Sequence, residues 1–95
     1  MIIAITQKQK EFLFNVLLKY NSNLFELVKQ NCFPYFNKYK IIVSDEIGSD
    51  LRDLCEDALI KIGFDEAYNL NENGKILEDL SDLIYQSSMY QTTLY

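Results

Sequence analysis

Carboxylates are the residues best suited to chemistry in this chain, and they gather in one stretch. Ser44 to Asp57, SDEIGSDLRDLCED, holds six acids and a single base, Arg52. Closely spaced carboxylates can hydrolyse a glycosidic bond as an acid–base pair or hold a divalent cation. Here they follow a helical spacing and lack the alternating loop spacing of an EF-hand. The stretch therefore favours a charged surface over a catalytic or metal centre.

The remaining composition also argues against catalysis. The chain has no histidine, which removes the commonest general base and metal ligand at neutral pH. It contains no C-x-x-C, G-x-S-x-G, P-loop or G-x-G-x-x-G motif. Cys32 and Cys55 are expected to be free thiols, and a Cys nucleophile would have no histidine to activate it. We predict no enzymatic activity, no cofactor and no metal.

A helical projection sorts the acidic stretch into two faces. With about 100° per residue, one arc collects the apolar side chains Ile47, Leu51, Leu54, Cys55, Ala58 and Ile62. A second arc collects Glu46, Asp50, Asp53 and Asp57, which we call the acidic stripe. Its two i,i+4 like-charge pairs cost roughly 1 kcal/mol or less together. That cost is too small to demand a function, so a solvated face is the alternative interpretation of the stripe.

The distribution of charge favours the functional interpretation. Residues 1–43 carry six lysines and two glutamates, a net charge of +4, whereas residues 44–95 carry three bases and twelve acids, a net charge of −9. Such a difference bears on partners and association rate rather than on fold. We predict that a basic partner binds the acidic stripe together with Asp65, Glu66 and Tyr68 beside it.

Helical patterns must position these side chains. Thr6 and Gln9 form a capping box before an apolar set, Phe12 to Tyr20, that recurs as one buried helix face should. A shorter helix through Leu24 to Val28 is expected to end near Asn31, before Pro34.

Two more helices are expected in the acidic half. Ser44 is a good N-cap for a helix that ends at Ile62, with Gly63 as its C′ residue. Asn71 caps a final helix with an apolar i, i+1, i+4, i+7, i+8 pattern from Ile76 to Ile84. The 95 residues make a single domain, 1–95, of the mostly α class. We predict a compact bundle of three to five helices.

The segment from Tyr35 to Val43 is ambiguous. A short strand near residues 41–43 or an extended connector both fit its period-two pattern. Lys38 and Lys40 alternate with Tyr35 and Tyr39, which would suit phosphate contact and base stacking. We favour tyrosines that pack and lysines that are solvated, because the acidic half repels phosphate, and so predict no nucleic-acid partner.

No membrane association is predicted. No run approaches the roughly 18 apolar residues of a membrane span. The apolar start, Met1 to Ile5, is too short for a secretory signal. With two free thiols, the expected compartment is the cytoplasm.

The segment GFDEAYNLNENGKILEDLSDLIY, Gly63 to Tyr85, resembles the C-terminal part of small immunity proteins from bacterial toxin–immunity systems, including contact-dependent inhibition. It contains a Gly-Phe-Asp turn, an Asn-Glu-x-Gly helix start and a Leu-Glu-Asp-Leu helix. The resemblance implies stoichiometric neutralisation of a cognate toxin in the cytoplasm, and many such toxins are nucleases with basic clefts. No family residue transfers to this chain, so the predicted binding residues come from charge geometry alone.

Two other classes of function remain open. One is a helical adaptor or regulatory domain that acts as a homodimer through its Phe/Tyr-rich first half, and the other is a small hydrolase or metal-binding protein. An immunity protein should bind one partner with an association rate that falls as salt rises. A dimeric adaptor should self-associate, and a metal-dependent protein should gain thermal stability with a divalent cation.

Overall fold

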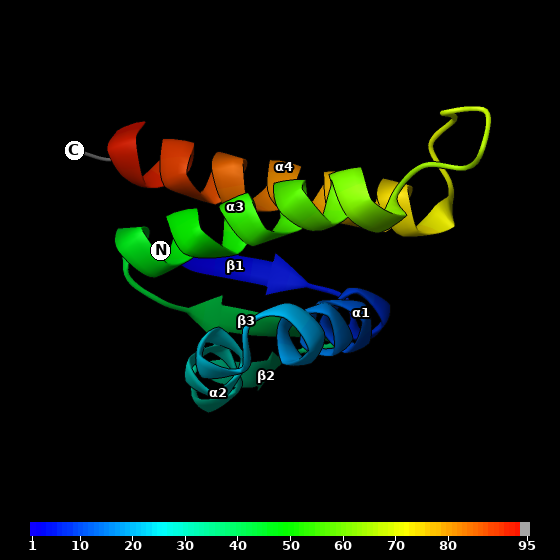
Figure 1. Cartoon of the computed structure of the whole chain (residues 1–95). Coiled ribbons are helices and arrows are strands. Elements are labelled where there is room, and N and C mark those ends of the chain that lie inside the picture. The colour runs from blue at the N-terminus through cyan, green and yellow to red at the C-terminus, as the bar shows by residue number, and fades with distance from the viewer. Residues whose placement is uncertain (94–95) are drawn as a thin grey trace.

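The computed structural model describes the backbone of residues 1–93 and the side chains of residues 1–87. Within that part, four helices and three strands follow one another in the order β1-α1-α2-β2-β3-α3-α4 (Figure 1). They are β1 (Ile2–Ile5), α1 (Gln7–Tyr20), α2 (Ser22–Gln30), β2 (Cys32–Tyr35), β3 (Lys38–Ile42), α3 (Asp45–Ile62) and α4 (Glu72–Thr93). The mostly helical class and the number of helices are as predicted.

Side-chain caps set the helix starts. The hydroxyl of Thr6 accepts from the amide of Gln9 while the Gln9 side chain accepts from the amide of Thr6, so the predicted capping box is present. Ser44 Oγ accepts from the Ile47 amide at 3.2 Å, and Asn71 Oδ1 accepts from the Gly74 amide at 2.8 Å. These bonds satisfy amides that the first helical turn leaves without partners.

The sheet is the main difference from the predicted fold. Its order is β1-β3-β2 with antiparallel pairing throughout, and Ile41 of β3 lies between Ile3 of β1 and Cys32 of β2. The strand expected near 41–43 is β3, but β1 and β2 were not predicted. Both are four residues long, and such short strands depend on pairing with a distant segment rather than on a local pattern.

The two faces of the sheet have different surroundings. Ile3, Ile5 and Ile41 are buried on the inner face. The other face, which we call the outer sheet face, carries the alternate residues Ile2, Ala4, Phe33, Tyr35, Lys38, Lys40 and Ile42. Helices α1 and α2 lie over the inner face, while α3 and α4 lie side by side beyond β1 (Figure 1). The structure is therefore not a bundle of helices alone, as predicted. It is a three-stranded sheet with helices packed against it, and the sheet completes the core.

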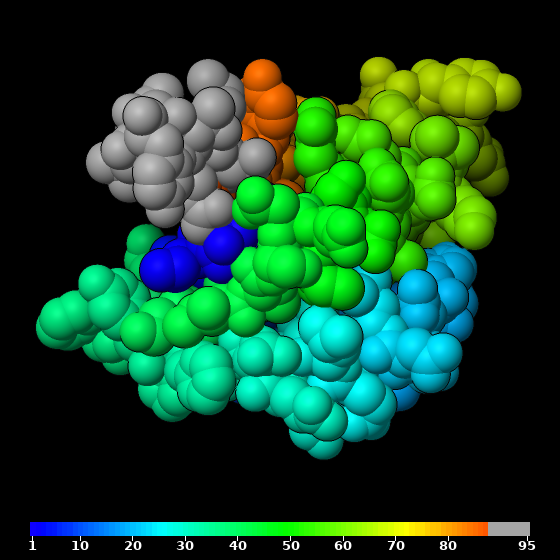
Figure 2. Space-filling view, turned by 90° about the vertical axis from the view of Figure 1, so that its left-hand side faces the viewer, coloured from blue at the N-terminus to red at the C-terminus, as the bar shows by residue number. Residues whose placement is uncertain are grey.

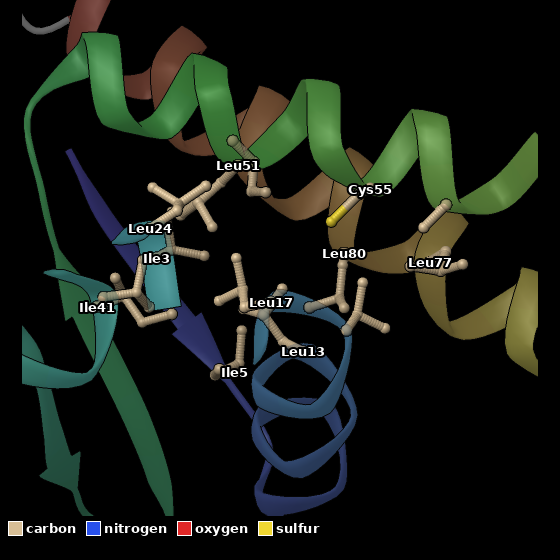
Figure 3. Close-up of a cluster of buried hydrophobic side chains, with 14 of the residues drawn as sticks. Ile3, Ile5, Leu13, Leu17, Leu24, Ile41, Leu51, Cys55, Leu77 and Leu80 are labelled. Atoms are coloured by element: carbon tan, nitrogen blue, oxygen red, sulfur yellow. The ribbon is translucent and has the colours of Figure 1, made fainter. Parts of the chain in front are cut away.

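One cluster of buried apolar side chains joins these elements. Ile3 and Ile41 of the sheet meet Leu17 of α1, Leu51 of α3 and Leu80 of α4 (Figure 3), and each is at most 1% exposed. Burying each such side chain contributes about 1.5–3 kcal/mol. Both oppositely charged halves of the chain therefore depend on the same core. None of the helices in the described residues is long and apolar enough to span a bilayer.

Candidate functional site

The acidic stripe lies on the solvent side of α3. Gly48, Leu51, Cys55 and Ala58 are the buried residues of this helix. Glu46, Asp50, Asp53 and Asp57 are all exposed, as the helical projection predicted. The helix begins at Asp45, so Glu46 belongs to the stripe and lies in the first turn, where the helix dipole favours a negative charge.

The bases of α3 do not neutralise the stripe. Arg52 turns toward α4, where its guanidinium lies 4.7 Å from the Tyr85 ring centroid and its Nε lies 3.4 Å from Glu56. Lys61 turns toward α1, with its Nζ 5.0 Å from the Tyr20 ring centroid. In the described part of the chain, no carboxylate of the acidic stripe takes part in an ion pair. The stripe is therefore free to attract positive charge.

The loop between α3 and α4 holds the other three predicted residues. Asp65 Oδ1 accepts from the amides of Ala67 and Asn69, both at 2.9 Å. Asp65 thus folds the loop as well as adding charge, whereas Glu66 is exposed. Tyr68 is 87% exposed and has a φ of 63°, a left-handed conformation that is costly for a residue with a Cβ. The loop holds this ring in solvent.

Glycine contacts anchor both ends of the loop. Asn71 Nδ2 donates to the Ile62 carbonyl at 2.9 Å, and the Asn71 amide donates to the Gly63 carbonyl at 2.9 Å. A Cβ on Gly74 would collide with the Gly63 carbonyl oxygen. Gly63 follows α3 as predicted, but its φ of −89° is right-handed. Close backbone packing, not a left-handed C′ conformation, therefore explains the glycine.

Two apolar side chains that the sequence analysis did not single out, Ile60 and Phe64, lie where α3 meets this loop. Ile60 is 77% exposed and Phe64, the first residue of the loop after Gly63, is 43% exposed. The signal was present in the sequence, because the projection places Ile60 outside the apolar arc and next to Asp53. Ile60 and the exposed Tyr68 of the loop lie among carboxylates, where such side chains can act as binding anchors.

The cysteines are free, as expected. Burial, with a smaller contribution from Glu56, raises the pKa of the Cys55 thiol to about 12, so this thiol is protonated at neutral pH. Burial also raises the pKa of Cys32, against a smaller lowering effect of Lys10. Among the described side chains, no group of three or more His, Cys, Asp or Glu residues is arranged to hold a metal ion.

A hollow of about 180 Å³ lies beside the N-terminal half of α3, and no residue of the acidic stripe lines it. Met1, Asp45, Ser49, Arg52, Ile84 and Tyr85 line it. Each cation at the hollow has a carboxylate neighbour. The Met1 amine is 4.0 Å from Asp45, and Arg52 Nε is 3.4 Å from Glu56. The hollow therefore lacks the uncompensated charge that distinguishes the stripe.

Comparisons with protein-family models, curated proteins and solved structures gave no match to this chain. The function is therefore inferred from the surface of the molecule itself.

Proposed function

We propose that this protein is a bacterial immunity protein that binds and neutralises a cognate toxin, a nuclease with a basic face, in the cytoplasm. The observation that carries the proposal is the acidic stripe, whose four exposed carboxylates have no basic partner in the described part of the chain. The resemblance of Gly63 to Tyr85 to small immunity proteins supports the same function.

Two kinds of contact, electrostatic and apolar, would contribute to binding. The stripe would steer a basic cleft toward α3, since complementary charge raises association rates by orders of magnitude at low salt. Ile60 and Tyr68, at the end of the same helix and in the following loop, would then supply apolar contacts. A few such side chains usually carry most of the binding energy of an interface.

Inhibition in this scheme is stoichiometric. The inhibitor supplies negative charge where the toxin would otherwise hold the phosphates of its substrate, so it needs no catalytic group. Because the stripe is exposed, salt should reduce the association rate much more than the dissociation rate.

The test is co-purification of the tagged chain from its native cells. The triple variant Asp50→Lys/Asp53→Lys/Asp57→Lys should lose a basic, nuclease-like partner that the native chain retains. The matched control is Glu78→Lys/Asp79→Lys/Asp82→Lys, which changes three exposed acids of α4 and shifts the net charge equally.

Retention in the control and loss in the stripe variant would assign binding to α3. Equal loss in both variants would show that net charge alone matters, and the absence of a partner for the native chain would refute the function.

A further inference from the structure

The outer sheet face leaves apolar side chains in solvent. Ile2, Phe33, Tyr35 and Ile42 are between 40% and 57% exposed. Phe36, in the turn of the β2–β3 hairpin, is 92% exposed, and its ring meets that of Tyr35 edge to face at 4.8 Å. The hairpin projects from the body of the molecule (Figure 2). Adjacent exposed apolar side chains of this kind mark interaction surfaces.

The composition of this face changes along the strands. Ile2 and Ile42 pair at one end, whereas Tyr35 pairs with Lys38 at the hairpin end. Tyr35 and Phe36 thus lie toward one end, Phe33 lies at the centre beside Lys40, and the isoleucines lie toward the other end. A second copy turned by 180° about an axis across the strands would place the hairpin end of each copy over the isoleucine end of the other.

Charge also changes along the strands, from one end of the outer sheet face to the other. None of the three strands contains an acid, and the only charged residues of the outer sheet face are Lys38 and Lys40. Lys40 leans toward the hairpin end, because its Nζ lies 5.2 Å from the Tyr35 ring centroid. Beyond the other end of β3, α3 opens with Asp45 and Glu46, both exposed. The Met1 amine, 4.0 Å from Asp45, offsets one of these two carboxylates, and a net negative charge remains. The face is therefore basic at one end and weakly acidic just beyond the other.

We propose that the outer sheet face binds a second copy of this chain about a two-fold axis near Lys40. In this arrangement Lys38 of each copy lies opposite Ile42 of its partner and reaches toward the partner's Asp45. The two Lys40 ammonium groups point away from the axis, each toward its own Tyr35 ring. The interface is the same patch on both copies, so it closes as a dimer and does not extend into a fibre.

Self-association through this face is favoured over strand pairing along the edge of β2. The Ile42 amide donates to the Asn31 carbonyl, which sets the alternation of the β2–β3 ladder and turns the backbone of Pro34 away from β3. Pro34 has no N–H to offer a further strand, so pairing along β2 is blocked at its centre.

The size of the face sets the strength of the dimer. Three strands spaced about 4.8 Å apart, with a length of four or five residues, cover roughly 250 Å² in projection. Even with the projecting hairpin this is below the roughly 800 Å² per partner of a stable complex. We therefore expect a weak dimer, with a Kd of roughly 10 µM to 1 mM. This inference does not depend on toxin binding, because none of the residues that it pairs across the two copies belongs to the acidic stripe.

Sedimentation equilibrium of the full chain, up to about 1 mM, tests the proposal against the expected weak affinity. Phe36→Lys and Ile2→Lys should each weaken the dimer at least tenfold, because two-fold symmetry introduces each change twice. The matched control is Leu18→Lys on α1, since Leu18 and Ile2 are both 57% exposed. Phe36 is almost fully exposed in a turn, so its variant should remain folded by circular dichroism.

A charge swap tests the orientation. Lys38→Glu and Asp45→Lys should each weaken the dimer, and the double variant should restore it to within about threefold, as expected for exposed ion pairs. A chain that stays monomeric, forms open-ended oligomers or is affected equally by Leu18→Lys would overturn the proposal. It would also fail if the monomer bound an oligo(dT) probe through this face, with binding lost in Lys38→Glu.

Discussion

The acidic stripe and the outer sheet face are both exposed, but they are built in different ways. The stripe lies along one helix, so four residues within twelve positions share a face through helical geometry alone. The outer sheet face combines residues 2 to 42 and exists only when three strands pair. Local sequence therefore specifies the stripe, whereas the sheet face depends on tertiary structure, and the shared core keeps both in place.

The largest effect should come from a cavity in that shared core. Leu80→Ala removes a fully buried side chain of α4 and should lower the free energy of unfolding by about 2–5 kcal/mol. Urea denaturation at neutral pH measures this change. If the two halves depend on one core, a probe in the sheet and a probe in α3 should report the same transition. Separate transitions would show that the two surfaces have independent supports.

The next prediction compares two glycines of the helical half. Gly74→Ala should destabilise the protein by about 1–3 kcal/mol, because its Cβ would meet the backbone carbonyl of Gly63, which cannot move freely. The control is Gly48→Ala, whose Cβ would meet the flexible thioether of Met1. Higher helix propensity, worth up to about 1 kcal/mol, offsets that contact. Thermal unfolding that ranked the two variants in the opposite order would contradict the close-packing explanation.

Burial of the Cys55 thiol predicts that the stability of the protein depends on pH. In the folded state the pKa of Cys55 is raised to about 12 from an ordinary value of 9.0. Above pH 9 the thiol of the unfolded chain ionises while the folded thiol does not. Stability is therefore fully present below pH 9 and falls as pH rises toward 12, by up to about 1.4 kcal/mol per pH unit from this group.

Urea denaturation of the native chain and of Cys55→Ala across pH 8 to 11 isolates this contribution. The variant should be less stable at pH 8, and the gap between the two proteins should narrow as pH rises. A constant gap would show that Cys55 is not protected from ionisation in the folded state.

The smallest effects distinguish the two surfaces most directly. Phe36 and Tyr68 have φ values of 54° and 63°, where glycine is unstrained. Phe36→Gly and Tyr68→Gly should each leave stability unchanged or raise it by up to about 1 kcal/mol. At the same time, Phe36→Gly should weaken only the proposed dimer and Tyr68→Gly only the proposed complex with a toxin.

Thermal unfolding, sedimentation and toxin association together check this pair, and each variant serves as the control for the other. A loss of stability in both variants would mean that the rings contribute to the fold and are not held in solvent for binding.

Much of the helical architecture could be predicted from sequence because its signals are local. Thr6 and Gln9, Ser44, and Asn71 cap helices through bonds to residues three positions away. The apolar periods gave the buried faces of α1, α3 and α4. The same geometry placed the acidic stripe in solvent and, applied to Ile60, would have shown that this isoleucine is exposed.

Tertiary structure decided the sheet, the partners of the bases and the surroundings of the loop. The strand β1 forms because Ile3 meets Ile41, 38 positions away, and no local pattern encodes that pairing. Arg52 is one position from Asp53, yet packing against Tyr85 of α4 turns it away from the stripe. The physical reason is the range of the interactions. Caps and helical faces depend on neighbours within one or two turns, whereas strand pairing and charge compensation depend on which distant segments the core brings together.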